Sequence, residues 1–475
     1  MPKRVWIGLM VCVGLTLIGL VTWRICSGNT MMTTITINPQ VDYQTIEGFG
    51  ASTAWWAQVV GGWEDERQQI VDWLFDSESG IGLTIVRYNL GGGDGWNIAD
   101  PWRRAETFEV AAGQYDWGRD ANALWVLKAA QQRGVEHVVA FVNSPPARMT
   151  VSGLTTGEKD GKSNLRPEMY DDFVRYLVDV VRHLRNDEGL PVTYLSPINE
   201  PQWPWSYKNG QEGCHYTPQE AAALTRRLVT ALAAENLPVL VSAPELAEWK
   251  RSEPYVDALL GDAVLAGQLP HLAVHSYWSN REDKQRLVRY LDRHYPGTQL
   301  WMSEWTEMKE GRDTGMDSAL VLANTVQDDL VLGGVTSWQY WIAVSKYYFR
   351  DGLIYVDEAS RRLIPTQRLW ALGNFSRFVR PGAVRVEALC TGAGCDELNI
   401  SAFRSADAQT LVLVVVNNGP QPQQVRLDVP QGWQVWQVYE TSAERSLQRM
   451  ESTPLQAARA EWSFAAQSVT TVVLR

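Results

Sequence analysis

Residues 192–243 contain a strand, a helix and a second strand in succession. The first segment, VTYLSPIN (192–199), and the third, VLVSA (239–243), are apolar and rich in β-branched residues, which is typical of buried strands. Between them, TPQEAAALTRRLVTALAAE (217–235) has helical spacing. It opens with a threonine suited to an N-cap, followed by proline and, at the third helical position, glutamate. The segment therefore predicts a βαβ unit with parallel strands.

The same alternation of strand and helix extends over most of the chain. Strands are expected at 47–52, 83–89, 137–143, 192–199, 239–243, 272–276, 299–303 and 335–341, and helices at 64–75, 120–133, 167–185, 217–235, 283–293, 317–332 and 367–378. Eight βα units over about 330 residues predict an α/β fold in which the sheet closes into a (β/α)₈ TIM barrel. An open doubly wound sheet is the alternative, but no Gly-x-Gly-x-x-Gly follows a strand.

The pattern changes after residue 380. Short strands separated by turn residues are expected at 411–417, 424–429, 433–439 and 468–474, and no long helix is evident. These strands predict a β-sandwich appended to the barrel. A β-branched strand at 33–37 precedes the barrel and is expected to return to this sandwich. The expected organisation is therefore an N-terminal segment at 1–32, a catalytic barrel at 46–380, and a side domain built from 33–45 and 381–475.

Composition narrows the classes of ligand. The 475 residues carry a formal net charge of −11, so a nucleic-acid partner is not expected. Five cysteines form no Cys-x-x-Cys pair, and we expect neither a metal nor an organic cofactor. The 22 tryptophans outnumber the 10 phenylalanines and the 17 tyrosines. Many of them suit core packing, but together they favour a carbohydrate ligand, because an indole face can cover the C–H face of a sugar while its N–H meets a hydroxyl.

The N-terminal segment is expected to be a signal anchor or a long signal peptide. Lys3 and Arg4 precede 19 uncharged residues from Val5 to Trp23. This run is close to the length of about 20 residues that spans a bilayer and exceeds an ordinary signal-peptide core. We therefore expect an extracellular protein, either secreted or anchored to the outer face of the membrane through this segment alone. Separately, we expect the protein to be a monomer. Export would also permit a disulfide between Cys390 and Cys395, with two unpaired thiols as the alternative.

Two glutamates follow apolar strands of the expected barrel. Glu200 lies in Ser196-Pro197-Ile198-Asn199-Glu200-Pro201 after the fourth strand, and Glu304 lies in Trp301-Met302-Ser303-Glu304-Trp305 at the end of the seventh. In such barrels the active site lies at the C-terminal ends of the strands. A carboxylic acid is costly to bury there without a role. Glycoside cleavage needs a pair of this kind, whereas two separately ion-paired loop residues would be the structural alternative.

The flanking sequence resembles glycoside hydrolase family 30, a family of retaining glycosidases with (β/α)₈ barrels. Asn199-Glu200-Pro201 and Ser303-Glu304 are similar to the acid/base and nucleophile motifs of that clan. The other matching segments are Glu47-Gly48-Phe49-Gly50, Arg87-Tyr88-Asn89, Asn143-Ser144-Pro145-Pro146, His275-Ser276-Tyr277 and FSRFVRPG (375–382). The resemblance covers about residues 35–475, and in this family a β-sandwich built from both ends of the chain accompanies the barrel.

By this resemblance Glu200 is the general acid/base and Glu304 the nucleophile. The resemblance further implies that Asn199 binds the sugar 2-hydroxyl and that Arg87 and Tyr277 hydrogen-bond the nucleophile. A plain structural role is the alternative for the last two. Further candidates for substrate binding are Trp341 as a platform under the sugar, Asn143, Trp56, Trp203 and His275, with core packing as the alternative for Trp341 and a satisfied strand-end residue as the alternative for His275.

The resemblance is greatest to the endo-β-1,6-galactanase branch. Loop aromatics at Trp55, Trp56, Trp96, Trp203 and Trp205 suit an extended cleft for a polysaccharide or oligosaccharide. A β-1,6-glucanase, a xylanase or a β-glucosidase/glucosylceramidase on the same scaffold is the alternative within enzymes. A surface protein that binds glycans without cleaving them is the alternative of another class. Three further acidic residues follow expected strands or lie in loops. Glu245 is a candidate substrate contact, with a loop salt bridge as the alternative. Asp94 and Glu212 lie in loops that could line the cleft, and a solvated position is favoured for both.

Overall fold

A computed structural model of the chain describes residues 32–475 except 94–96 and 452–458. The expected N-terminal signal segment lies outside the described residues, save for Met32 at its end. Within the described part of the chain, no helix is both long and apolar enough to cross a bilayer.

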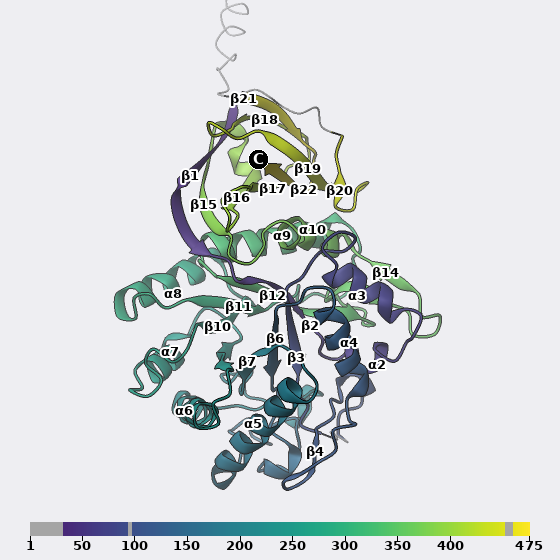
Figure 1. Cartoon of the computed structure of the whole chain (residues 1–475), viewed down its shortest axis with the longest axis vertical. Helices are drawn as coiled ribbons and strands as arrows, with labels where there is room; N and C mark the ends of the chain where they lie inside the picture. Colours follow the sequence, from purple (N-terminus) through teal and green to yellow (C-terminus); the bar gives the residue numbers. More distant parts are fainter. Residues whose placement is uncertain (1–31, 94–96, 452–458) are drawn as a thin grey trace, which may run out of the picture.

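The larger part of the chain is the expected (β/α)₈ barrel (Figure 1). Its parallel strands are β2 (Gly48–Ser52), β3 (Ile85–Asn89), β6 (His137–Phe141), β7 (Val192–Ser196), β8 (Leu240–Val241), β9 (Ala243–Leu246), β10 (Leu272–His275), β11 (Leu300–Glu304) and β12 (Ser337–Ser345). They are hydrogen-bonded in the order β8-β7-β6-β3-β2-β12-β11-β10-β9. The two ends of this order, β8 and β9, are consecutive in the chain, so the sheet returns on itself.

The fifth barrel strand is divided in two at Ser242. Residues before it pair with β7, and residues after it pair with β10. The N–H of Ser242 donates to the carbonyl of Leu195 at 3.1 Å, which holds the break against β7. A single strand at 239–243 was expected, and the division moves the second half, with Glu245, into the barrel wall.

Helices surround the barrel. They are α2 (Ala57–Val60), α3 (Arg67–Phe75), α4 (Ala121–Gln131), α5 (Tyr170–Asn186), α6 (Pro218–Ala234), α7 (Glu253–Leu260), α8 (Arg281–His294), α9 (Met316–Val331) and α10 (Gln367–Ser376). The cap expected at α6 is confirmed, because Thr217 accepts the N–H of Glu220 through its hydroxyl while the Glu220 carboxylate accepts the N–H of Thr217. Two small strands, β4 (Glu109–Ala111) and β5 (Gln114–Tyr115), form a separate hairpin. A second pair, β13 (Gly352–Val356) and β14 (Leu363–Pro365), extends the barrel sheet beside β12.

The expected β-domain is one curled nine-stranded sheet. Its strands are β1 (Thr33–Thr45), β15 (Val384–Thr391), β16 (Leu398–Arg404), β17 (Leu411–Asn417), β18 (Gln423–Asp428), β19 (Val435–Thr441), β20 (Gln448–Arg449), β21 (Arg459–Phe464) and β22 (Ser468–Leu474). Alternate residues of β17 serve two cores, as the period of a strand requires. Leu411, Leu413 and Val415 face the core inside the curled sheet, whereas the valines between them join the barrel core. The β-domain is therefore packed on the barrel, against α9 and α10 (Figure 1).

Strand β1 lies inside this C-terminal sheet although it precedes the barrel in sequence. It pairs antiparallel with β15 and parallel with β18. The disulfide left open by the sequence is present, because Cys390 at the end of β15 is bonded to Cys395. Cys214 is a buried free thiol.

Candidate active site

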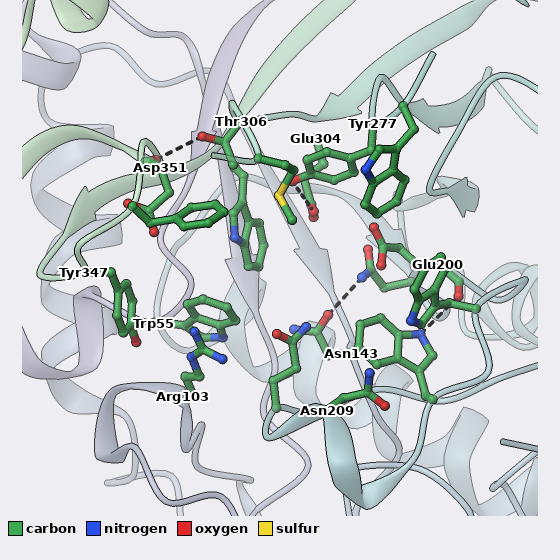
Figure 2. A pocket seen from close by; sticks show the side chains of 18 of the residues that line it. Trp55, Arg103, Asn143, Glu200, Asn209, Tyr277, Glu304, Thr306, Tyr347 and Asp351 are labelled. Carbon is green, nitrogen blue, oxygen red and sulfur yellow. Dashed lines mark hydrogen bonds between the residues drawn. The ribbon is translucent and has the colours of Figure 1, made fainter. Parts of the chain in front are cut away.

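A cavity of about 710 Å³ opens at the C-terminal ends of the barrel strands (Figure 2). Both glutamates line it, Glu304 from the last residue of β11 and Glu200 from the loop after β7. Five other predicted site residues also line it: Asn143, Asn199, Trp203, Tyr277 and Trp341. The fold therefore brings residues from five separate segments of the chain together, the two glutamates expected from their strand-end positions and the others from the family resemblance or as loop aromatics.

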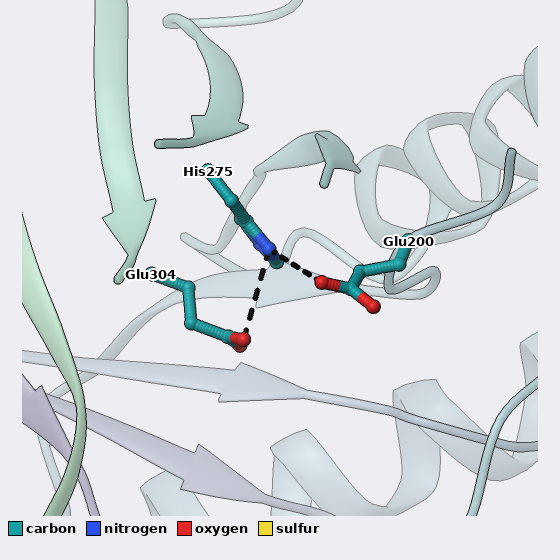
Figure 3. Close-up of side chains that lie close together, drawn as sticks. All are labelled: Glu200, His275 and Glu304. Carbon is teal, nitrogen blue, oxygen red and sulfur yellow. Dashed lines mark hydrogen bonds and ion pairs between the residues drawn. The ribbon is translucent and has the colours of Figure 1, made fainter. Parts of the chain in front are cut away.

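The two carboxyl groups lie close together. Glu304 is 4% exposed and Glu200 is half-buried. One oxygen of each, together with a ring nitrogen of His275, lies within 4.8 Å of the others (Figure 3). Retaining glycosidases separate their carboxyl groups by about 5–5.5 Å, and inverting enzymes by about 6.5–9.5 Å to leave room for water. The spacing matches direct attack on the sugar by one of the two groups.

Glu304 is held by two donors, one on each oxygen. The guanidinium of Arg87, at the middle of β3, donates to Oε2 at 2.5 Å, and the hydroxyl of Tyr277 donates to Oε1 at 3.0 Å. Burial raises the pKa of Glu304, while the positive charges of His275 and Arg87 and the Tyr277 hydrogen bond act in the opposite direction. The donors therefore stabilise the ionised form that a nucleophile needs, within a site whose burial disfavours charge.

His275 lies beneath the cavity, fully buried at the end of β10. Its Nδ1 is 3.2 Å from Glu200 and 3.7 Å from Glu304, and its Nε2 is 3.2 Å from Glu245. Burial alone would lower the pKa of His275, but the carboxylates of Glu304, Glu200 and Glu245 raise it to about 9. At neutral pH the ring is therefore an imidazolium that donates from both nitrogens.

Glu245 completes this buried charge cluster. Its Oε2 lies 3.5 Å from Arg87 and accepts the hydroxyl proton of Ser303, while Oε1 accepts from Ser242 at 3.2 Å. Burial would raise the pKa of Glu245, but Arg87 and His275 lower it to about 2. Of the two roles considered for this residue, the structure shows the salt bridge, and Glu245 lies behind the cavity wall.

The amide side chains form a row beside the two glutamates. Arg87 donates to Oδ1 of Asn199 at 2.8 Å, and Nδ2 of Asn199 donates to Oδ1 of Asn143 at 3.0 Å, a bond drawn in Figure 2. Both asparagines are nine-tenths buried. Because both also line the cavity, each can direct its remaining amide hydrogen toward a bound hydroxyl.

Comparison with known proteins identifies the family. Residues 32–355 match the model of O-glycosyl hydrolase family 30. The chain belongs to glycoside hydrolase family 30. It is similar to an endo-β-1,6-galactanase of Hypocrea rufa, with 26% identity over 82% of this chain and 81% of that protein. It is also similar to glucuronoxylanase XynC of Bacillus subtilis, with 22% identity over 81% and 78% of the two chains.

Among solved structures, a conserved exported protein from Bacteroides fragilis superposes on 93% of this family 30 chain and 100% of its own, with a TM-score of 0.84 and 27% identity. The family 30 chain is thus an O-glycosyl hydrolase that acts on β-glycans, with a TIM barrel and a β-domain.

The aromatic residues of this family 30 site differ in part from those expected. Trp56 is fully buried and donates its indole N–H to the carbonyl of Ser52 at 3.0 Å, so its expected contact with substrate is wrong. Its neighbour Trp55, which was also expected among the cleft aromatics, lines the cavity and packs edge-on against Trp341. A positive φ of 62° at Trp55 turns the chain so that the two neighbouring indoles point to different places.

A stacked pair of indoles lies beside Glu200. Trp203, expected at the site, is 40% exposed, and Trp278 is 51% exposed. Their rings are 5.5 Å apart and inclined by only 14°. Trp278 has φ 47°, an uncommon backbone conformation for a bulky residue. Trp278 was not predicted from the sequence, although this residue directly follows the His275-Ser276-Tyr277 motif.

The opposite wall of the cavity was also missed. Arg103, Tyr347 and Asp351 line it (Figure 2). The Arg103 guanidinium lies 4.4 Å from the centre of the Trp55 ring and 5.0 Å from that of Tyr347. Burial raises the pKa of Asp351 to about 6. No sequence motif marked these residues: Arg103 lies in the segment that follows β3, and Tyr347 and Asp351 lie in the connection between β12 and β13.

Of the remaining acidic candidates, Glu212 does not line the cavity. Glu212 is 3% exposed, so its expected solvated position is wrong. Asp94 and Trp96 lie outside the described residues.

Glu200, His275 and Glu304 are spaced closely enough to hold a cation. An imidazolium has no free lone pair for a metal, however, and Arg87 and Tyr277 already occupy the Glu304 oxygens. His271 is four residues before His275, but its Nε2 bonds to Ser242 and its ring stacks on Trp301. The geometry of these groups is therefore explained without a cofactor.

Proposed function

We propose that this family 30 enzyme is a retaining endo-β-1,6-galactanase, with Glu200 as general acid/base and Glu304 as nucleophile. The single observation that carries the proposal is the pairing of the two carboxyl groups within 4.8 Å, combined with the Arg87 and Tyr277 hydrogen bonds that Glu304 accepts. A pair at this distance supports double displacement, because it leaves no room for water between the nucleophile and the anomeric carbon.

In the first step Glu304 attacks the anomeric carbon while Glu200 gives its proton to the departing glycosidic oxygen. The resulting ester removes the negative charge of Glu304. In the second step Glu200 takes a proton from water, which attacks the same carbon and releases Glu304. Nδ1 of His275 lies 3.2 Å from Glu200 and can hydrogen-bond its carboxyl group at this second stage.

The substrate assignment rests on the similarity to the endo-β-1,6-galactanase of Hypocrea rufa and on the aromatic lining of the cavity. The leaving part of the polysaccharide would lie on the side of Glu200, over Trp203 and Trp278. The other part would lie toward Trp341, Trp55 and Asp351. A xylanase is the second candidate, favoured by the glucuronoxylanase relative, and a β-1,6-glucanase or a β-glucosidase on the same scaffold is a further alternative.

Export of the enzyme is part of the proposal. The support is the apolar run from Val5 to Trp23, the exported protein among its structural neighbours, and the Cys390–Cys395 disulfide. We infer that the enzyme works outside the cell as a monomer, either released or held at the membrane by its N-terminal segment.

The test is incubation of the purified protein with arabinogalactan from which arabinose has been removed, and analysis of the products by size and mass. Glu200→Gln and Glu304→Gln are the inactive variants, and Glu282→Gln, an exposed glutamate on α8, is the matched control. We expect a ladder of galactose oligomers from the wild type and the control only.

Other outcomes assign the rival functions. Monosaccharide alone would indicate an exo-acting enzyme. Activity only on β-1,6-glucan or xylan would contradict the galactanase assignment. Glycan binding without turnover on any of these substrates, unchanged in both inactive variants, would favour the non-catalytic binding protein.

A further inference from the structure

A second cavity, of about 720 Å³, lies between the start of α8, the middle of α9 and the turn that follows β17. It is about as large as the catalytic cavity, and the proposed reaction does not use it. The lining residues that matter for its role are Ser276, Trp278, Trp305, Val321, Asn324 and Asn418. We call this cavity the α8–α9 groove.

The α8–α9 groove shares a wall with the catalytic cavity. Tyr277 lines the catalytic cavity, and its neighbour Ser276 lines the groove. In the same way Glu304 lines the catalytic cavity and its neighbour Trp305 lines the groove. The chain at the ends of β10 and β11 therefore separates the two cavities.

Trp278 is the residue that lies in the walls of both cavities. Its ring stacks on that of Trp203, with 5.5 Å between the centres and an inclination of 14°. Trp278 is nevertheless 51% exposed, so part of the indole remains free to cover an apolar sugar face. A polysaccharide that leaves the catalytic cavity on the side of Glu200 and passes Trp278 meets the α8–α9 groove next.

The polar lining of the groove suits an uncharged ligand. Its two cations are paired with carboxylates of α9, Lys284 with Asp329 at 2.6 Å and Arg281 with Asp328 at 3.5 Å. The other polar side chains that line it carry amides, hydroxyls or an indole N–H. A phosphorylated ligand would require unpaired cations, whereas amides and hydroxyls are partners for the hydroxyl groups of a neutral sugar.

The β-domain contributes an oriented amide to the groove, that of Asn418. Nδ2 of Asn324 donates to Oδ1 of Asn418 at 2.6 Å, and Nδ2 of Asn418 donates back to Oδ1 of Asn324 at 3.2 Å. An amide nitrogen carries two hydrogens, and within the described part of the chain the second hydrogen of Asn418 has no acceptor. Because Asn418 is exposed, this hydrogen is available to a hydroxyl group of a ligand.

We propose that the α8–α9 groove binds an uncharged stretch of the polysaccharide on the leaving-group side, with Trp278 as the platform at its entrance and Asn418 as a hydroxyl contact. This inference rests on the proposed function, because the position of the general acid Glu200 decides which side the leaving group occupies. The β-domain then takes part in substrate binding, and long chains gain a contact that short glycosides lack.

The experiment changes the groove and leaves the catalytic cavity intact. Val321 is 42% exposed on α9, so Val321→Arg fills the groove with a long side chain from the protein surface. Asn418→Ala removes the free amide. Each variant is assayed on the polysaccharide that the wild type cleaves fastest and on an aryl β-glycoside. On the polysaccharide we expect kcat/KM to fall about 10-fold in Val321→Arg and a few-fold in Asn418→Ala, the size of one lost contact. On the aryl glycoside, which presents a single small ring beyond the cleaved bond, the change should stay within about twofold.

The matched control is Val110→Arg, a change at an exposed valine of β4 that lines neither cavity. It should resemble the wild type on both substrates. An equal loss on both substrates in Val321→Arg would overturn the inference, because the change would then act on the catalytic cavity. Unchanged activity of Val321→Arg on the polysaccharide would overturn it as well.

A binding measurement separates this inference from the proposed function. Glu304→Gln, with and without Val321→Arg, is titrated calorimetrically with galactan, glucan and xylan oligomers of increasing length. We expect long oligomers to bind more weakly when the groove is filled, and short ones to bind equally. If the wild type cleaved none of these glycans, the proposed function would fail, but weaker binding of long oligomers would still support the groove as a glycan site. Equal binding of long oligomers by both proteins would overturn the inference.

Discussion

Nδ1 of His275 lies 3.2 Å from Oε1 of Glu200 (Figure 3). The same nitrogen is 3.7 Å from Glu304, so one buried cation stands between the two proposed catalytic carboxylates. The protonated ring places a positive charge beside both groups. The charge of His275 therefore links the stability of the site to pH.

The stability of the enzyme should fall at alkaline pH because of His275. Its pKa is raised to about 9 in the folded protein from 6.5 when unperturbed, so its contribution is fully present below about pH 6.5 and is lost as the pH rises through 9. A shift of this size corresponds to roughly 3 kcal/mol. Denaturant unfolding of His275→Gln between pH 6 and 10 should show a flatter alkaline decline than the wild type. Parallel curves would contradict the role of this ring.

Glu245→Gln should destabilise the protein by about 3–5 kcal/mol at pH 7, because it leaves Arg87 and His275 buried with one carboxylate fewer. The folded pKa of Glu245 is lowered to about 2 from 4.5, so its contribution is present above about pH 4.5 and is lost as the pH falls through 2. Unfolding measured from pH 3 to 7 should show the two proteins converging toward acid. Glu248→Gln, a nearby change outside the cluster, should follow the wild type.

The roles of the two glutamates can be separated with azide. Glu200→Gly should lose about 10²- to 10⁴-fold on natural substrate and less on an aryl glycoside whose leaving group needs no proton. Azide should then restore turnover and give a glycosyl azide of retained configuration. Glu304→Gly should give the inverted azide, because the anion enters where the carboxylate stood. The same configuration from both variants would refute the assignment.

Trp278→Ala should weaken catalysis in proportion to the length of the leaving group. Loss of a large apolar face costs about 10-fold or more in kcat/KM on galactan if sugars stack there. An aryl galactoside presents only one small ring on the side of the Trp203–Trp278 pair, so its kcat/KM should fall less. An equal loss on both substrates would show that the pair only supports the Glu200 loop. Trp436 is an exposed indole that does not line the cavity, so Trp436→Ala is the matched control for removing an indole.

The barrel could be predicted from the sequence because apolar strands and a capped helix, such as those of 192–243, are local signals. The division of the fifth strand was not predicted, because it depends on tertiary pairing: the first half, β8, pairs with β7, and the second half, β9, pairs with β10. Helix α7 was missed because it has only eight residues. In the β-domain, β15 and β16 were missed because several of their side chains are only partly buried, which weakens the alternation.

For the site, residue type and strand position located Glu200 and Glu304. The choice between Trp55 and Trp56 could not be made, because it depends on a left-handed φ at Trp55. Glu212 was misjudged for another reason. A glutamate in a glycine-containing loop is usually solvated, and only the folded chain brings Gly92 and Asn89 against it.

The placement of β1 imposes an order on biosynthesis. Its partners β15 and β18 begin at residues 384 and 423, long after β1 ends at residue 45. At ribosomal rates of about 5–20 residues per second, the strand waits roughly 20–70 s for its first neighbour. During that time both of its edges are open to other chains. The barrel can assemble while the chain emerges, but the β-domain can close only when its last strands have been synthesised. In a nascent chain of this enzyme, the segment to be protected from pairing with other chains is therefore the early strand β1.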